Sequence, residues 1–250
     1  MADSELQRVN AFRSAFARGQ AVRVVPVRGG FTVSDERFRH SFEHNQLIVD
    51  APVDLPTVLG LYPGHPQVTV YDDALGRLCA EPLRLAGYRH SSEVVMAHTG
   101  PVPHPAPGRA AEVRPEELRE PVLRQLRLWM PDHDAEVVRQ LADRREARSG
   151  GAAQVLFLAA RTADGRIAAW CDLYLDPASG IAQIEEVVAD SALLRRGHAD
   201  AVLAAALHRA EAEGCPLRFL VADADDWPQH WYARRGFAEI GRSHTFTRGD

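Results

Sequence analysis

The sequence contains no lysine. All 29 of its basic residues are arginine, so chemistry that depends on a lysine Schiff base, a lysine nucleophile or the lysine of a phosphate-binding P-loop is excluded. This absence removes two large classes of protein from consideration: enzymes that hold pyridoxal phosphate on a lysine, and the common P-loop NTPases.

Cysteine is also scarce. Cys79, Cys171 and Cys215 are an odd number, lie far apart and form no Cys-x-x-Cys motif, which argues against a disulfide framework or a thiolate zinc site. His40 and His44 lie four residues apart, but no third ligand is evident, so we interpret them as surface histidines. We therefore expect no metal site and a reducing compartment.

Long apolar runs are missing as well. No stretch approaches the roughly 18 apolar residues that a membrane span requires, and the first residues, MADSELQRVN, lack the apolar core of a signal peptide. The net charge of -5 gives no general attraction for nucleic-acid phosphates. We expect a cytoplasmic protein that binds neither a membrane nor nucleic acid.

The composition that remains is that of a globular protein, with 46% hydrophobic and 25% charged residues in a chain of 250. Residues 99–112 alternate four prolines with small residues, and such a run predicts an extended spacer because proline fixes φ and donates no hydrogen bond. We therefore expect a first domain at 1–100, a proline-rich linker at 101–112 and a second domain at 113–250.

Apolar periodicity and turn residues predict helices and strands in both domains. The first domain is expected to have helices at 4–18 and 74–86 and strands at 21–27, 46–49, 68–71 and 93–97. The second is expected to have helices at 115–130, 135–148, 197–213 and 228–235, and strands at 154–161, 167–175, 181–189, 217–221, 237–240 and 244–247. The first three strands of the second domain are joined by short turns and suggest an antiparallel meander.

Both domains close on a similar segment. AEPLRLAGYRHSSEVVMAH and PQHWYARRGFAEIGRSHTF each read as a helix, a Gly-aromatic pair and a strand. A repeat of about 100 residues indicates a duplicated domain. The alternative is that this helix–strand junction is simply a common one.

The junction after the strand QIEEVVAD is the strongest chemical signal. The chain passes through SALL into RRGHADAVLAAALHRAEAEG, which reads as a turn and then the first turn of a helix. Unpaired N–H groups at a helix start attract anions, Gly197 allows close approach of a phosphate, and Arg195 and Arg196 add positive charge. The junction therefore favours a phosphorylated ligand, although an ordinary exposed loop can also contain one glycine and two arginines.

Two motifs in order resemble the GNAT superfamily of acyl-CoA N-acetyltransferases over about 118–248. The pyrophosphate loop of the family, Q/R-x-x-G-x-G/A, resembles Leu194-Arg195-Arg196-Gly197-His198-Ala199, and its closing motif, Tyr-x-x-x-Gly-Phe, resembles Tyr232-Ala233-Arg234-Arg235-Gly236-Phe237. One departure is plain, since Leu194 stands where the family has Gln or Arg. The resemblance implies a mixed α/β (α+β) fold with a mostly antiparallel central sheet flanked by helices.

The resemblance also implies roles for individual residues. Backbone groups of one strand would pair with the pantetheine arm of acetyl-CoA, and amides of the loop would bind its pyrophosphate. Tyr232 would protonate the departing thiolate, the alternative being a core aromatic at a helix end. The implied coenzyme-binding residues are Val187, Val188 and Ala189 on the strand and Arg195, Arg196, Gly197, His198 and Ala199 in the loop.

Direct attack on a thioester requires a neutral amine, and a carboxylate could accept its proton. Strand alternation places Gln183 and Glu185 on one face and Ile184 and Glu186 on the other. We predict Glu185 as the general base, with Glu186 in reserve. The alternative is an ion pair with a nearby arginine, since adjacent carboxylates in a sheet need solvent or a partner.

Together these observations predict an acetyl-CoA-dependent N-acetyltransferase that acts on a primary amine of a small molecule or peptide; an antibiotic- or toxin-modifying enzyme would be a substrate variant. The alternative is a non-catalytic acyl-CoA-binding or regulatory protein. The first domain has no turn equivalent to RRGHA, so we predict a degenerate GNAT-like copy that binds no coenzyme. It would contribute to the acceptor pocket or to a homodimer surface.

Overall fold

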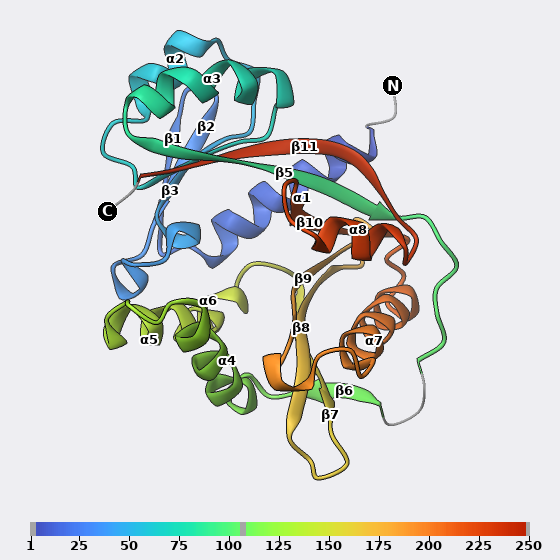
Figure 1. Ribbon diagram of the computed structural model, residues 1–250. Coiled ribbons are helices and arrows are strands. Elements are labelled where there is room, and N and C mark those ends of the chain that lie inside the picture. Colours follow the sequence, from blue (N-terminus) through green and yellow to red (C-terminus); the bar gives the residue numbers. More distant parts are fainter. Residues whose placement is uncertain (1–3, 106–108, 249–250) are drawn as a thin grey trace. The chain divides into compact units, whose positions relative to one another are not determined.

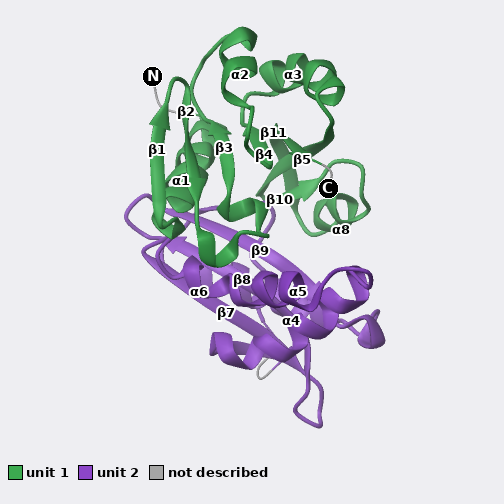
Figure 2. Ribbon diagram, turned by 90° about the vertical axis from the view of Figure 1, so that its left-hand side faces the viewer, with its two compact units in different colours: residues 1–99, 221–250 green, residues 100–220 purple. Residues whose placement is uncertain are grey.

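The computed structural model describes residues 4–105 and 109–248 and divides into two compact units. The first unit contains residues 1–99 and 221–250, and the second contains residues 100–220 (Figure 2). The sequence suggests that 221–250 belong with 113–220, but the structure assigns them to the first unit. The reason is strand pairing: β11 (Phe237–Arg248) pairs antiparallel with β5 (Tyr88–His98) and with β4 (Gln67–Val70).

The first unit is built on a sheet with the order β1-β2-β3-β4-β11-β5. Strands β3 and β4 are parallel, and the other neighbours are antiparallel. The three remaining strands are β1 (Arg23–Val27), β2 (Gly30–Ser34) and β3 (Gln46–Val49). The helices are α1 (Glu5–Gln20), α2 (Leu55–Leu61), α3 (Asp73–Leu85) and α8 (Pro228–Ala233), with short 3-10 helices η1 (Glu36–Phe38) and η2 (Phe42–His44).

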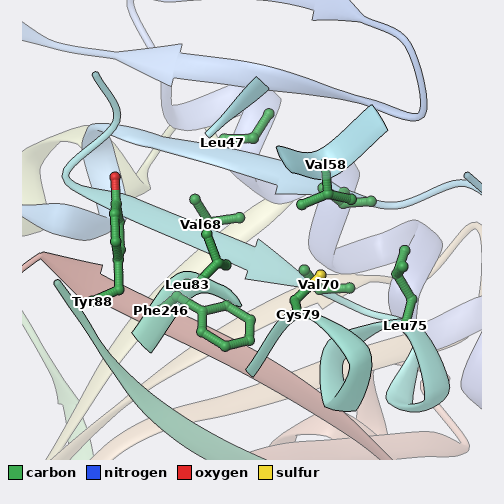
Figure 3. Packing of buried hydrophobic residues seen from close by; sticks show 10 residues of the cluster. Leu47, Val58, Val68, Val70, Leu75, Cys79, Leu83, Tyr88 and Phe246 are labelled. Atoms are coloured by element: carbon green, nitrogen blue, oxygen red, sulfur yellow. The ribbon is translucent and has the colours of Figure 1, made fainter. Parts of the chain in front are cut away.

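Strand β3 is buried on both of its faces. Leu47 and Val49 of β3 pack in one apolar cluster with α2 and α3, which Figure 3 shows from close by. Ile48, between them, points the other way and packs with Ala17 of α1. Alternate residues of β3 thus enter two separate clusters, which is why its last three residues are all apolar rather than alternating with polar ones.

The second unit is built on a sheet with the order β6-β7-β8-β9-β10. Only β9 and β10 are parallel, so the predicted antiparallel meander of β7, β8 and β9 is confirmed. The strands are β6 (Ala110–Val113), β7 (Gln154–Arg161), β8 (Ile167–Asp176), β9 (Ile181–Ala189) and β10 (Leu217–Asp223), the last of which continues into the first unit.

Helices cover the strands of the second unit too. Helices α4 (Pro115–Trp129) and α5 (Ala135–Asp143) pack with Trp170 in one apolar cluster. Helix α7 (His198–Ala212) packs against β7, β8 and β9, and Figure 1 shows it on the opposite side of these strands from α4 and α5. The short helix α6 (Arg145–Arg148) and the 3-10 helix η3 (Ser191–Leu193) complete the unit. The predicted mixed fold, with a mostly antiparallel sheet flanked by helices, is therefore confirmed.

Several elements differ from the sequence prediction. Strand β2, helix α2 and strand β6 are additional, and β6 begins inside the expected linker, of which residues 106–108 lie outside the described residues. The expected helix at 135–148 is divided at Arg144 into α5 and α6. The two strands expected after residue 236 are one strand, β11, with a register shift between Glu239 and Gly241.

The two halves of the chain share an order of elements. An antiparallel meander (β1-β2-β3), a helix (α2), a strand parallel to the last of the meander (β4), a second helix (α3) and a final strand (β5) occur in the first half. The second half repeats this order as β7-β8-β9, α7, β10, α8 and β11. This agreement extends over more elements than the sequence repeat did.

Candidate functional site

Strand β9 has an open edge over its second half. It pairs with β10 only through Ile181, Ala182 and Gln183, whereas on its other side it stays paired with β8 as far as Ala189. Residues 185–189 are partly exposed. Along this half of β9, backbone N–H and C=O groups on one side have no partner in β10, and such an edge can accept an added extended chain.

A β-bulge lies in the same half of β9. Trp170 of β8 is opposite Val188 and Asp172 is opposite Glu185, so Glu186 and Val187 together face the single residue Cys171. Glu186 has a φ of 49°, a left-handed conformation that costs a residue with a Cβ about 1–2 kcal/mol. The bulge redirects the backbone next to the open edge and breaks the alternation of side chains expected from the sequence.

The loop that follows joins this strand to α7. Arg195 and Gly197 both have positive φ, 60° and 79°, and Leu194, Arg195 and Arg196 are exposed. Gly197 is the N-cap of α7 and makes no side-chain cap hydrogen bond, and a Cβ on it would meet no atom within 4 Å. The helix start therefore presents N–H groups beside open space, as an anion site requires.

The base of this loop is held by α4. The Asp190 carboxylate accepts hydrogen bonds from the Ala192 N–H and from Arg124 Nη2, both at 2.9 Å. Ser191 Oγ lies 3.1 Å from Gln125 Nε2. Although burial raises the pKa of Asp190, these donors outweigh it and leave the pKa below its usual value. The loop thus starts from a fixed, negatively charged anchor.

The two candidate bases have different surroundings. Glu185 Oε2 accepts a hydrogen bond from Gln183 Nε2 at 2.7 Å. Glu186 instead accepts from Arg144 Nη2 at 2.9 Å, from Arg148 Nη2 at 2.7 Å and from Arg145. Burial raises the pKa of Glu186, but the charges of the three arginines outweigh it and hold the pKa well below its usual value. These contacts favour the ion-pair alternative for Glu186, because such a carboxylate is a weak proton acceptor.

Comparison with known proteins bears on this geometry. Residues 122–237 match the model of the acetyltransferase (GNAT) family. These residues are a GNAT acetyltransferase domain. The family and the fold support acyl transfer, and the GNAT domain contains the open edge of β9, the bulge and the Gly197 loop.

Solved structures agree with the fold of this GNAT domain and its neighbouring half. A GCN5-related N-acetyltransferase from Kribbella flavida is 18% identical with a TM-score of 0.60, and the match covers 96% of each chain. A functionally unknown conserved protein from Staphylococcus epidermidis is 11% identical with a TM-score of 0.62, covering 91% of this chain and 94% of that one. No curated protein matches the chain.

Tyr232 of the GNAT domain belongs to the first unit. It lies on α8, is 8% exposed, and its ring makes edge contacts with Trp231 and Phe237 at centroid distances of 5.0 and 5.7 Å. The residues expected to bind coenzyme A, 187–189 and 195–199, lie in the second unit. The packing of the Tyr232 ring matches the core-aromatic alternative, so its catalytic role stays a prediction.

Two findings concern metals and membranes. In the described part of the chain, no three His, Cys, Asp or Glu side chains are grouped as a metal site would need. The expectation that His44 lies on the surface is wrong. It is 1% exposed, and its Nδ1 lies 3.0 Å from Ser41 Oγ. No helix among residues 4–105 and 109–248 has both the length and the apolar character of a membrane span.

Sequence reasoning missed the charged partners of Glu186. Arg144, Arg145 and Arg148 come from the segment RREAR, and Arg145 and Arg148 also contact Asp172 of β8, which is fully buried. A signal was present, because Asp172 is a carboxylate inside the apolar strand WCDLYL and a buried carboxylate needs a partner. Which arginine supplies that partner depends on how α6 packs on the sheet.

The residues present fit an acyl-coenzyme A. A pantetheine arm carries amide groups that can pair with an open strand edge, and a diphosphate matches an uncapped helix start flanked by Arg195 and Arg196. The described loop offers one fewer side-chain contact than the family pattern, since Leu194 is apolar and 55% exposed.

Proposed function

We propose that this protein transfers an acetyl group from acetyl-CoA to a primary amine of a small molecule or peptide. The observation that carries the proposal is the separation of β9 from β10 after Gln183, on a strand that leads directly into the uncapped start of α7. One continuous segment thus offers a slot for an extended arm and, at its end, a site for a diphosphate.

In this proposal, backbone groups of Val187, Val188 and Ala189 pair with the pantetheine arm. The N–H groups of residues 195–199 bind the diphosphate, supported by the charges of Arg195 and Arg196. Because most of these contacts come from the backbone, replacing the usual Gln or Arg by Leu194 weakens the site without removing it.

The proposed reaction is a direct attack. The amine nitrogen bonds to the carbonyl carbon of the thioester while the carbon–sulfur bond breaks, and the products are the N-acetylated amine and the free thiol of coenzyme A. Glu185 accepts the amine proton, directly or through water, and a backbone N–H near Val188 stabilises the charge that develops on the carbonyl oxygen. Tyr232 supplies the proton to the departing thiolate.

A second candidate is a non-catalytic acyl-CoA-binding or regulatory protein. Two observations favour it: the apolar Leu194 in the loop, and the ion pairs of Glu186, which leave Glu185 as the single proposed base among the pair. The two candidates differ in one measurement, because both bind coenzyme A and only the enzyme releases its thiol.

The test combines calorimetry with a thiol-release assay. The wild-type chain is titrated with acetyl-CoA and then incubated with acetyl-CoA and a panel of primary amines. Thiol release that depends on an amine supports the enzyme, and binding without release supports the regulatory candidate. No binding heat with millimolar acetyl-CoA would contradict both.

Two substitutions test the proposed proton transfers. Glu185→Gln should lower kcat about 10²–10⁴-fold and remove the acidic limb of the pH–rate profile, because the amine proton then has no acceptor. Tyr232→Phe should lower kcat while leaving the Kd for coenzyme A within about threefold, since only the hydroxyl is lost. Unchanged kcat in either variant assigns that residue a structural role instead.

We also propose that residues 1–100 are a degenerate GNAT-like copy that binds no coenzyme and contributes to the acceptor pocket or to a homodimer surface. The shared order of elements supports duplication. Helix α2 occupies the position of α7 in that order. Its N-cap is Asp54, whose side chain accepts hydrogen bonds from the Thr57 N–H and hydroxyl. A carboxylate at this helix start leaves no place for a phosphate. Dependence on acetyl-CoA agrees with a cytoplasmic protein.

A further inference from the structure

The second unit contains an arginine–carboxylate cluster that the proposed reaction does not use. It consists of Arg144, Arg145, Arg148, Asp172 and Glu186. Arg145 Nε donates to both Asp172 oxygens at 3.1 and 3.2 Å, and Arg148 Nη1 also contacts Asp172. Since both arginines contact Glu186 as well, each of them joins β8 to β9 across the bulge.

The cluster is more deeply buried than an ordinary ion pair. The side chains of Asp172, Arg148 and Arg145 are 0%, 1% and 5% exposed, and Glu186 is 22% exposed. The free energy needed to remove such charges from water is about as large as the free energy gained from their attraction. Apolar side chains of the same volume often give an equally stable protein. Stability alone therefore does not account for the cluster, whereas a need to fix a particular geometry does.

That geometry is the backbone of Glu186. Outside glycine, positive φ occurs among the described residues only at Glu186 and Arg195. Glutamate does not favour this conformation by itself, and its carboxylate is where three guanidinium groups converge. The cluster thus holds the end of the side chain whose backbone forms the bulge.

We propose that Arg145 and Arg148 are positioning residues, which hold Glu186 in its left-handed conformation and thereby fix the bulge that presents the backbone of Val187 and Val188 to the thioester. This inference rests on the proposed acetyl transfer. It assigns Glu186 an architectural task and separates it from Glu185, which remains the proposed base.

The central test compares Glu186→Gly with Glu186→Ala. Both variants lose the carboxylate, but only glycine adopts positive φ at no steric cost. If the left-handed conformation is what matters, kcat should be about tenfold higher in Glu186→Gly than in Glu186→Ala, the ratio expected when alanine must pay the left-handed penalty. The Kd for coenzyme A should rise less than kcat falls, because the Gly197 loop that binds the diphosphate is unchanged and only the contacts of the pantetheine arm depend on the bulge.

A suppressor experiment tests the arginine. Arg148→Gln should lower kcat, and adding Glu186→Gly should recover part of the loss, because glycine no longer needs to be held. A purely structural arginine would give a double variant no more active than Arg148→Gln. The pH–rate profile of Glu186→Gly should match that of the wild type, and loss of its acidic limb would identify Glu186 as the base and overturn the proposal.

Hydrogen exchange keeps this inference separate from the proposed function. If the wild type releases no thiol with any amine, acetyl transfer is contradicted, yet the amides of residues 185–189 that pair with β8 still report the bulge. They should exchange faster in Glu186→Ala than in Glu186→Gly by about tenfold. Equal exchange and equal kcat in the two variants would overturn the positioning role.

Discussion

The two halves of the chain use one order of elements and differ at the junction between a strand and a helix. In the first unit, β3 pairs with β4 along all four of its residues, and Asp54 caps the helix that follows. In the second unit, β9 leaves β10 after three residues, and α7 begins at Gly197 without a side-chain cap. The same topology is thus closed by its own groups in one half and left open in the other.

This difference indicates which backbone groups of such a fold are available to a ligand. A paired strand edge and a capped helix start have satisfied hydrogen-bonding groups, so they offer nothing to a ligand. An unpaired edge and an uncapped start leave those groups for an external partner. The proposed binding of coenzyme A therefore depends on a few local residues, and both junctions can be changed experimentally.

The largest effect is expected from Gly197→Asp, which places a carboxylate at the start of α7, as Asp54 does at the start of α2. Aspartate tolerates positive φ better than most residues, and its carboxylate would repel a diphosphate and compete with it for the positive potential of the helix start. Calorimetry should show the Kd for coenzyme A rising by about 100-fold.

The matched control in the first unit is Asp54→Ala. It removes the cap of α2 and should lower the melting temperature slightly while leaving the Kd for coenzyme A unchanged. If Gly197→Asp binds coenzyme A as tightly as the wild type, the contrast between the two junctions has no functional meaning.

A smaller effect is expected where α3 meets β11. A Cβ at Gly76 would overlap the ring of His244, which is 3% exposed and whose Nε2 lies 2.9 Å from Asp73 Oδ1. Gly76→Ala should therefore lower the free energy of unfolding by about 1–3 kcal/mol, as overpacking does. This result would show that the last strand of the chain is an integral part of the first unit.

The matched helical control is Gly60→Ala in α2, where a Cβ meets no atom within 4 Å. It should raise the free energy of unfolding by up to about 1 kcal/mol, the helix preference for alanine. Urea titration measures the free energy of unfolding of both variants. A change of the same sign in both would contradict the close packing of α3 on β11.

The smallest expected effect is a change of stability with pH, which we expect from His90 of the first unit and not from Glu186 of the second. His90 Nε2 lies 2.8 Å from His244 Nδ1, beside Asp73 and Asp225. Burial and the neighbouring His244 lower the pKa of His90 below its ordinary 6.5. The folded state then binds fewer protons than the unfolded state, so stability is lost as pH falls below about 6.5. The change stays under about 1 kcal/mol because the ring is exposed.

Thermal unfolding between pH 7.5 and 5.5 measures this loss, and His90→Gln should remove it. Glu186 of the second unit should contribute no change in that range, because its pKa is held well below its usual value. A pH dependence that persists unchanged in His90→Gln would assign it to other groups.

Much of the local structure was predictable from the sequence. Strands β3, β7 and β9 begin and end at the predicted residues, because their apolar and β-branched runs are bounded by turns. The Gly197 loop was found because glycine and two arginines before a helix are a local pattern. Strand β2 and helix α2 were missed, since they are short and carry a weak apolar period.

The candidate site was only partly predictable. Strand alternation assumes a regular ladder, and the bulge at Glu186 breaks it. Whether Glu186 is a general base or the partner of an arginine depended on the segment at α6, whose arginines lie about 40 residues earlier in the chain. No spacing rule brings those residues together.

By itself, the sequence determined where most helices and strands form and that Gly197 and two arginines precede a helix, because these follow from neighbouring residues. Only the tertiary structure decided that β11 lies between β4 and β5, that β9 parts from β10, and that three arginines converge on Glu186. Strand partners and buried ion pairs join residues distant in the chain, and their free energy depends on the packing of the whole unit.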